Sequence, residues 1–287
     1  MLTSLYVNDV NIQTEGTIMT NDAAWGVVTG ASSGLGALFA EQLAERGMPL
    51  ILAGRDESRL AQVRDRVQKR KPGMHAELVV GDLGTDKGIR DLIDVLDGRD
   101  VDVLVNNAGF GTYGPVSETD ADRERELVAV NVDALVRLTH AVLPGMLARG
   151  RGGILNVAST IAFQPAPYQA TYGASKAFVL SFSQALWAET RGTGVSVTAL
   201  CPGPTRTGFV DALDADVADV AVYKNLAEPE PVVKAGLRAL DRGRPVVIPG
   251  WRNWLLANGA DVMPGRISTM ISRRMLRPGR RTAIPAV

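Results

Sequence analysis

The chain changes character at Trp25, where short apolar runs begin to alternate with amphipathic segments of helix length. Such alternation is typical of βαβ units on a parallel sheet. Right-handed crossovers place the carboxyl ends of the strands along one edge, where ligands bind in this architecture. The pattern predicts an α/β fold with a doubly wound, seven-stranded parallel sheet. Its strands are expected at residues 25–29, 50–53, 77–80, 101–106, 153–157, 196–200 and 246–249.

Three segments of the chain differ in composition. Residues 1–22 are polar and aperiodic, so we expect a flexible N-terminal arm, or an extension ahead of a true start at Met19. Residues 23–250 hold every predicted strand and should form one domain, as α/β chains of this length often do. Residues 251–287 follow the last strand and are expected to form a helical tail.

Composition narrows the function classes. Lys+Arg and Asp+Glu both number 31, so the chain lacks the positive field that would favour nucleic acid. The lone Cys201 excludes an internal disulfide and fits a reducing compartment. We find no apolar run of membrane-spanning length and no leader, and so expect a cytoplasmic protein. His75 and His140 lack a ligand pattern around them, so we interpret both as structural and predict no metal site.

The first strand runs into the segment TGASSGLG, residues 29–36, and then into a predicted helix. Gly30, Gly34 and Gly36 permit a tight turn, close approach of a pyrophosphate to backbone amides, and close packing of helix on strand. The spacing differs from GxGxxG, and a glycine-rich turn can also be a plain βα connection. Its place after the first strand favours a dinucleotide-binding loop.

The ends of the second and third strands carry the residues that would select a cofactor. Arg55 offers a guanidinium fork to a 2′-phosphate, which favours NADP over NAD. A register shift of one would instead place Asp56 there, although we favour Asp56 as the N-cap of the next helix. Asp82 either accepts from the adenine amino group or caps the helix that begins near Thr85.

Polar residues also mark the fourth strand end, the helix after it and the fifth strand end. The fourth strand ends in NNAG, Asn106 to Gly109, which can bind across strands or form an ordinary turn. Asn131 lies in the middle of the next helix, where an Asn often marks a local bulge with a purpose. The fifth strand delivers Ser159 to the same edge.

The segment YGASK, Tyr172 to Lys176, lies in a proline-free stretch that predicts a helix through Glu189. Residues four apart share a helix face, so the ammonium of Lys176 is expected beside the phenol of Tyr172. A nearby cation favours phenolate and should lower the pKa of Tyr172 towards acid/base work at neutral pH. The spacing alone is weak evidence, because Tyr and Lys occur at this spacing on many helices as a solvated pair.

Taken together, TGASSGLG, NNAG, Asn131, Ser159, YGASK and the PG at Pro202 resemble the classical short-chain dehydrogenase/reductase family in order and spacing. The resemblance covers about residues 25–250 without a missing motif and implies a single Rossmann domain. It implies that Tyr172 is the catalytic acid/base, with Lys176 lowering its pKa and holding the nicotinamide ribose. It further implies that Ser159 binds the substrate oxygen and that Asn131 orders a water linking Lys176 to solvent.

The same resemblance implies a set of cofactor contacts along the strand ends. The PG segment with its two threonines would hold the carboxamide and phosphate side of the cofactor. The expected contacts are Gly30, Ser32, Ser33, Gly34, Leu35, Gly36, Arg55, Asp82, Leu83, Asn107, Ala108, Gly109, Tyr172, Lys176, Pro202, Gly203, Thr205 and Thr207.

Beyond Gly203 the sequence describes access to the site. The apolar residues Val210, Leu213, Val217 and Val220 recur at helical spacing, which predicts an amphipathic helix that is either a lid or a plain surface helix. Aromatic side chains flank the predicted chemistry and suggest an apolar substrate region, although core packing would explain any one of them. These are Phe110, Tyr113, Phe163, Tyr168 and Phe209.

These features predict an NADP-preferring oxidoreductase that interconverts a ketone and a secondary alcohol on a moderately apolar small molecule. The alternative is a non-catalytic module that senses NADP through the same loop. The helices over residues 121–147 and 173–189 carry more apolar residues than one sheet-facing stripe needs, and family members commonly pair through these helices. We therefore expect a homo-oligomer.

The tail after residue 250 has its own pattern. Ile267, Met270, Ile271 and Met275 share one helical face, and the only acid among residues 251–287 is Asp261. Arginines supply the charge, at positions 266, 273, 274, 277, 280 and 281. Such a basic amphipathic helix can pack on the body or on a partner subunit, cover an apolar pocket, or make peripheral contact with a membrane.

Overall fold

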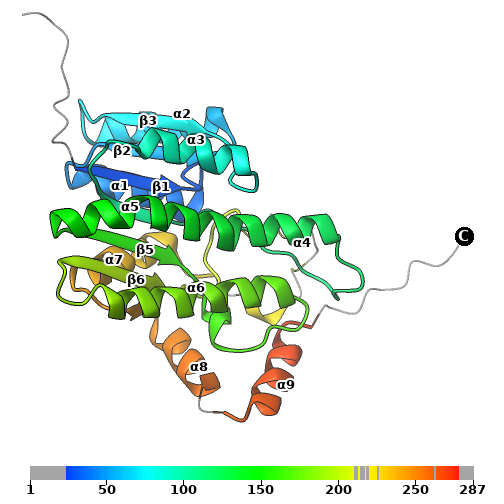
Figure 1. The fold of residues 1–287 in the computed structure, drawn as a ribbon. Helices are drawn as coiled ribbons and strands as arrows, with labels where there is room; N and C mark the ends of the chain where they lie inside the picture. The colour runs from blue at the N-terminus through cyan, green and yellow to red at the C-terminus, as the bar shows by residue number, and fades with distance from the viewer. Residues whose placement is uncertain are drawn as a thin grey trace, which may run out of the picture.

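The computed structural model describes residues 24–209, 213, 217, 220–224, 226–261 and 263–277. The expected N-terminal arm and the last ten residues of the tail lie outside these ranges. One parallel sheet organises the chain, in the strand order β3-β2-β1-β4-β5-β6-β7 (Figure 1). Its strands are β1 (Trp25–Thr29), β2 (Leu50–Gly54), β3 (Ala76–Val80), β4 (Val101–Asn106), β5 (Gly152–Val157), β6 (Val195–Leu200) and β7 (Val246–Val247).

The predicted doubly wound sheet is confirmed, and the predicted strand bounds agree to within one or two residues. Strand order reverses between β1 and β4, because the chain returns from β3 to the other side of β1. That reversal opens a crevice at the carboxyl ends of the two strands. The predicted last strand at 246–249 is shorter than expected, with only Val246 and Val247 in the sheet.

Helices cover both faces of the sheet. The helices between strands are α1 (Gly34–Glu45), α2 (Glu57–Arg70), α3 (Asp86–Leu96), α4 (Ala121–Val128), α5 (Leu135–Arg149), α6 (Ala170–Glu189) and α7 (Pro229–Asp241). Successive strand residues point to opposite layers, so Val28 packs with α1, α2 and α7, whereas Val27 packs with α3, α5 and α6. This burial on both faces explains why the strands read as continuous apolar runs.

A six-residue π-helix, η1 (Ala129–Ala134), joins α4 to α5 and contains Asn131. The predicted bulge is therefore confirmed at the residue that suggested it. The continuous helix Ala121–Arg149 is long and apolar enough to span a membrane, which the search for apolar runs did not anticipate. It packs on α3, α6, β4 and β5, as a core helix of the domain does.

Two short elements and two helices complete the described fold. The 3₁₀ turns are η2 (Thr160–Phe163) and η4 (Ala221–Tyr223), and the tail forms α8 (Trp251–Asp261) and α9 (Gly265–Met275). Figure 1 shows α8 and α9 projecting from the body of the domain below α6. The buried residues of α9 are Ser268 and Ser272, whereas Ile267, Met270 and Ile271 are exposed. The expected packing on the body is therefore wrong for Ile267 and Met270, whose side chains face outward, whereas packing on a partner subunit stays a prediction.

The predicted lid helix lies mostly outside the described residues. Leu213, Val217 and Val220 are described, are buried, and form an apolar cluster with Tyr113, Phe209 and Tyr223. These three residues therefore pack next to the loop after β4.

Candidate functional site

The loop between β1 and α1 has no space for larger side chains at its glycines. Its backbone is therefore open to close approach by a ligand. Gly30 has a φ of +62°, and a β-carbon built on Gly36 would lie 2.2 Å from the carbonyl oxygen of Gly30. Ser33 occupies the N-cap of α1, and its side chain makes no cap hydrogen bond in the described structure. The amides of the first turn therefore remain open to an anion, which fits a cofactor pyrophosphate.

The NNAG segment fastens β4 to this loop. The backbone amides of Asn107 and Ala108 each donate to the Thr29 hydroxyl at 3.0 Å. The Asn107 side chain donates to the carbonyl oxygens of Thr29 and Gly30 at 2.9 and 3.2 Å. Asn106 instead points into the core and donates to Asn156 at 2.9 Å. The segment therefore joins β4 to the loop after β1 and also lines the cavity. The role of Thr29 as the hydrogen-bonding partner was not predicted from the sequence.

Arg55 reaches the cavity at the end of β2, as predicted. Its guanidinium lies 3.3 Å from a carboxylate oxygen of Glu126, which the sequence did not indicate. Asp56 caps α2 by accepting from the Arg59 amide at 3.0 Å, as favoured from the sequence, and it also lines the cavity. Arg59 also lines the cavity beside Arg55, although the chain pattern did not single it out.

Asp82 and Leu83 line the cavity at the end of β3. A carboxylate oxygen of Asp82 accepts from the Gly84 amide at 2.9 Å. The cap of α3 is Thr85, whose hydroxyl accepts from the Gly88 amide, so the expectation that Asp82 caps this helix is wrong. Asp82 shapes the turn instead.

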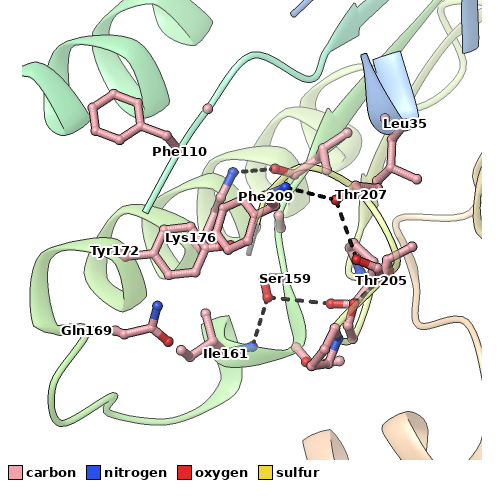
Figure 2. A pocket seen from close by; sticks show the side chains of 18 of the residues that line it. Leu35, Phe110, Ser159, Ile161, Gln169, Tyr172, Lys176, Thr205, Thr207 and Phe209 are labelled. Carbon is pink, nitrogen blue, oxygen red and sulfur yellow. Dashed lines mark hydrogen bonds between the residues drawn. The ribbon is translucent and has the colours of Figure 1, made fainter. Parts of the chain in front are cut away.

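Three of the four predicted catalytic residues, Ser159, Tyr172 and Lys176, line the cavity, and Asn131 is buried behind them. Figure 2 shows Tyr172, Ser159 and Lys176 around the same pocket, with Phe209 beside the Tyr172 ring. The ring centroids of Tyr172 and Phe209 are 5.3 Å apart. Lys176 lies one helical turn after Tyr172 on α6, its ammonium is 5.8 Å from the Tyr172 ring centre, and it donates to the Val157 carbonyl at 2.8 Å.

Asn131 is almost fully buried and holds the loop after β4. Its amide nitrogen donates to the Phe110 carbonyl at 3.0 Å and to the Ser175 hydroxyl at 3.1 Å. Its oxygen accepts from the Phe110 amide at 3.1 Å. The side chain is therefore committed to Phe110 and α6, and the water relay expected of Asn131 remains a prediction.

Burial changes the acid/base expectation for the pair on α6. Desolvation raises the pKa of Tyr172 well above its ordinary value, the nearby Tyr223 raises it further, and the Ser159 hydroxyl lowers it in part. Desolvation lowers the pKa of Lys176 to about 8. The predicted depression of the Tyr172 pKa by Lys176 is therefore wrong for the protein alone, because burial outweighs the neighbouring charge.

The PG segment after β6 forms the opposite wall. Ser159 donates to the Pro202 carbonyl at 3.4 Å, and its oxygen accepts from the Ile161 amide at 3.3 Å. The Thr205 hydroxyl donates to the Gly203 carbonyl at 2.8 Å, and Thr207 packs within 3.1 Å of a β-carbon built on Gly34. Cys201 just before this segment is fully buried, and desolvation raises the pKa of its thiol to about 12, as expected of a structural thiol.

A cavity of about 900 Å³ connects these walls from the glycine loop to the tail helices. It is lined by every predicted cofactor residue except Gly36, which lies beneath the loop. Of the five aromatic residues expected around a substrate, Phe110 and Phe209 line it. Tyr113, Phe163 and Tyr168 are not among its described lining residues, which corrects that expectation.

The part of the cavity that sequence analysis missed is its far end. There the lining is mainly apolar and comes from the tail, with two amides contributed by the segment before α6. The additional residues include Ile161, Gln164, Gln169, Tyr223, Leu255, Leu256, Met263, Ile271, Met275 and Leu276. The amphipathic pattern of the tail left open that its helix covers an apolar pocket, and Ile271 and Met275 of α9 do line this cavity.

The sequence model of the short chain dehydrogenase family matches residues 24–218. A short-chain dehydrogenase from Sphingobium yanoikuyae, solved in complex with NADPH, is 32% identical with a TM-score of 0.75. The match covers 90% of this chain and 99% of that one.

Two further relatives differ in what their names say of their substrates. The bulky-bulky ketone specific alcohol dehydrogenase from Comamonas testosteroni is 30% identical with a TM-score of 0.71, over 92% of this chain and 100% of that chain. A very-long-chain 3-oxoacyl-CoA reductase of Anas platyrhynchos is 38% identical over 184 residues. That match covers 62% of this chain and 59% of the relative.

Proposed function

Because the chain belongs to the short-chain dehydrogenase family, an oxidoreductase family that acts on CH–OH and C=O groups, we propose its specific reaction. The protein interconverts a ketone and a secondary alcohol on a moderately apolar small molecule with NADP(H), and Tyr172 is the acid/base. The observation that carries this proposal is that Tyr172 and Ser159 line one cavity, which also includes the first residues of α1 with their open amides (Figure 2).

The reaction requires a proton donor placed at the substrate oxygen. When bound, the reduced nicotinamide supplies the hydride. The Tyr172 hydroxyl stays protonated at neutral pH because burial raises its pKa, so it can donate a proton to a carbonyl oxygen. Ser159 donates a second hydrogen bond to that oxygen. Lys176, charged below its pKa of about 8, stabilises the resulting phenolate. These protonation states favour ketone reduction.

A preference for NADP rests on the charge at the end of β2. Arg55 and Arg59 both line the cavity where the second strand ends. A guanidinium there pairs with a 2′-phosphate, and the relative from Sphingobium yanoikuyae was solved with NADPH. Glu126 is the opposing influence, because its carboxylate already pairs with Arg55 and would repel the phosphate. Asp56 is a second carboxylate at this end of the cavity and lies 3.3 Å from the Arg59 guanidinium. We propose that Arg55 still favours the phosphate, because Glu126 is also paired with Arg123 at 2.6 Å.

The substrate is proposed to be bulky and apolar. Phe209, Ile161 and the tail helices supply apolar walls beyond Tyr172. The size and apolar lining of this part of the cavity suit a ketone with large hydrocarbon substituents. The substrates named for two of the relatives agree with this.

A direct spectrophotometric assay tests this function. Purified protein is incubated with NADPH and a panel of ketones that differ in the bulk of their two substituents, and the absorbance of the reduced nicotinamide is followed. We expect turnover to be fastest with bulky apolar ketones. A non-catalytic NADP sensor would instead bind NADPH with no turnover of any ketone or alcohol. The intact set of Asn131, Ser159, Tyr172 and Lys176 argues against that alternative.

We also propose a homo-oligomer in the cytoplasm, with the domain division at residues 22 and 250 as expected. Exposed apolar side chains lie on the predicted pairing helices, among them Val128, Leu147 and Phe178. Phe178 stacks on Phe182 with centroids 5.7 Å apart, which adds a flat aromatic surface on α6. Light scattering at micromolar concentration should give a multiple of the 30.5 kDa chain mass, and a monomeric mass would contradict the proposal.

A further inference from the structure

The helices α8 and α9 expose an unusual amount of apolar surface. Seven large apolar side chains on these two helices are between 44% and 71% exposed. They are Trp251, Trp254, Leu255, Leu256, Ile267, Met270 and Ile271, and together they define the tail apolar face. Contiguous exposed apolar surface of this kind marks a contact site for a partner or a membrane.

The tail apolar face is continuous with the catalytic cavity. Leu255 and Leu256 on α8 and Ile271 on α9 are exposed at the surface and also line the cavity. Met275 and Leu276 line the same cavity as Phe209 and Tyr172. An apolar path therefore runs from the outer surface between α8 and α9 to the Tyr172 hydroxyl.

Positive charge accompanies this apolar surface. Residues 251–287 contain seven arginines and one acid, Asp261. The five arginines among the described residues are all exposed, and none of them forms an ion pair with a carboxylate whose side chain the structure describes. They are Arg252, Arg266, Arg273, Arg274 and Arg277. In the rest of the chain, by contrast, Arg46, Arg70 and Arg137 are each paired with acids.

The charge decides between the two occupants that could cover such a face. A second copy of the chain would bring its own arginines against these, because a two-fold interface places the same patch on both sides. An anionic bilayer offers complementary charge to the arginines and apolar depth to Trp, Leu, Ile and Met side chains. Trp251 and Trp254, on the first turn of α8, suit the boundary between headgroups and acyl chains.

We propose that α8 and α9 dock on an anionic lipid surface, and that a membrane-partitioned ketone passes between them into the catalytic cavity. This inference rests on the proposed ketone and alcohol chemistry and specifies its substrate as a molecule delivered from the bilayer. The chain then works as a peripheral enzyme on the membrane surface, with its sheet and cofactor loop in the aqueous phase.

Vesicle binding of the full chain tests the docking. Co-sedimentation is measured with vesicles of phosphatidylcholine alone and with vesicles that also contain phosphatidylglycerol. We expect binding only to the anionic vesicles and weaker binding as salt rises. The double variant Arg273→Gln with Arg274→Gln should bind roughly twentyfold more weakly, since each surface arginine contributes about fivefold. The control Lys69→Gln with Lys71→Gln removes two exposed charges from the end of α2 and should bind as the parent does.

A second variant separates docking from chemistry. Ile267 and Met270 belong to the tail apolar face but do not line the cavity in the described structure. Ile267→Ser with Met270→Ser should lower vesicle binding by roughly tenfold or more. It should also slow reduction of a long-chain 2-alkanone held in anionic vesicles, while leaving reduction of a small water-soluble ketone unchanged.

The outcomes distinguish this inference from the proposed function. No reduction of any ketone in solution would refute the proposed function itself. Reduction in solution without binding of the parent to anionic vesicles would refute the membrane inference alone. Equal loss of binding in the α2 control would also refute it, because the attraction would then be a general charge effect. If the parent does not bind vesicles and the variant Ile267→Ser with Met270→Ser has a lower oligomer mass, the tail apolar face is instead a contact with a second copy of the chain.

Discussion

The cofactor side and the substrate side of the cavity are built by different forces. On the cofactor side, hydrogen bonds between Thr29, Asn107 and Ala108 join two strand ends. The glycines of the loop there lie too close to neighbouring atoms to carry a side chain. On the substrate side, α8 and α9 line the cavity with apolar side chains and leave much of their own apolar surface exposed. The bond from the Tyr113 hydroxyl to the Leu276 carbonyl, at 2.5 Å, ties the end of α9 to the body.

This difference follows from what each side has to recognise. A nucleotide presents a fixed pattern of phosphates and hydroxyls, and directional hydrogen bonds hold the amides that meet it. An apolar substrate presents surface without direction, so packing and the hydrophobic effect suffice to bind it. Substitutions on the cofactor side should therefore have sharp effects, and those on the substrate side graded ones.

The largest effect is expected where the two sides meet, at Tyr172. Tyr172→Phe removes the proton donor and keeps the ring that packs against Phe209, so kcat for ketone reduction should fall about a thousandfold. The affinity for NADPH, measured by fluorescence titration, should change little. Turnover at the parent rate with cofactor affinity retained would remove Tyr172 from the mechanism.

The next largest effect concerns cofactor choice. Arg55→Asp replaces a charge-assisted bond with repulsion, and should change the ratio of NADP to NAD affinity by about a hundredfold. Arg64→Asp, on α2 but outside the described cavity lining, serves as the charge control in the same titrations. Equal affinities of the parent for NAD and NADP would contradict the proposed preference. Glu126→Gln should move the ratio the opposite way by a few-fold, because it removes the competing carboxylate.

Stability of the two sides can be compared with one pair of glycine variants. Gly36→Ala puts a β-carbon 2.2 Å from the Gly30 carbonyl, and such overpacking should cost about 1–3 kcal/mol of unfolding free energy. Gly259→Ala in α8 meets no atom within 4 Å and should be neutral or gain up to about 1 kcal/mol from helix propensity. Chemical denaturation measures both. Similar losses at the two positions would contradict the contrast between the sides.

Lys176 predicts the pH dependence of the reductive direction. Its ammonium is charged below a pKa of about 8 and neutral above it, whereas Tyr172 stays protonated over the same range. The value of kcat/KM for NADPH should therefore be flat from pH 6 to 7 and fall about tenfold per pH unit well above 8. A profile that rises through pH 8 would indicate that neutral Lys176 is the active form.

The smallest effect is expected on the substrate side, at the attachment of α9. Tyr113→Phe removes the hydrogen bond to the Leu276 carbonyl and leaves the ring in its apolar cluster. A loss of about 1 kcal/mol in holding α9 should raise KM for a bulky ketone about fivefold, with kcat for a small ketone unchanged. A fall in kcat for both ketones would show that the bond supports the catalytic residues instead.

Local pattern was sufficient to predict most of the scaffold and to bring the candidate site residues to one edge of the sheet. The strands followed from apolar runs, because burial on both faces removes polar positions from a parallel strand. The π-helix followed from Asn131, whose side chain competes with helical hydrogen bonding. The Tyr172 and Lys176 spacing placed both on one face of α6, since four residues make about one helical turn.

What only the tertiary structure decided depends on residues far apart in the chain. The pKa of Tyr172 rises because the surrounding elements bury it, and burial is invisible in a spacing of four residues. Glu126 faces Arg55 across 71 positions, and Tyr113 reaches Leu276 across 163. The amphipathic pattern of α9 was read from the sequence, but its orientation was not. The spacing of apolar residues in the sequence predicts which side chains share a helix face. Which face is buried depends on the elements that the helix packs against in the folded protein.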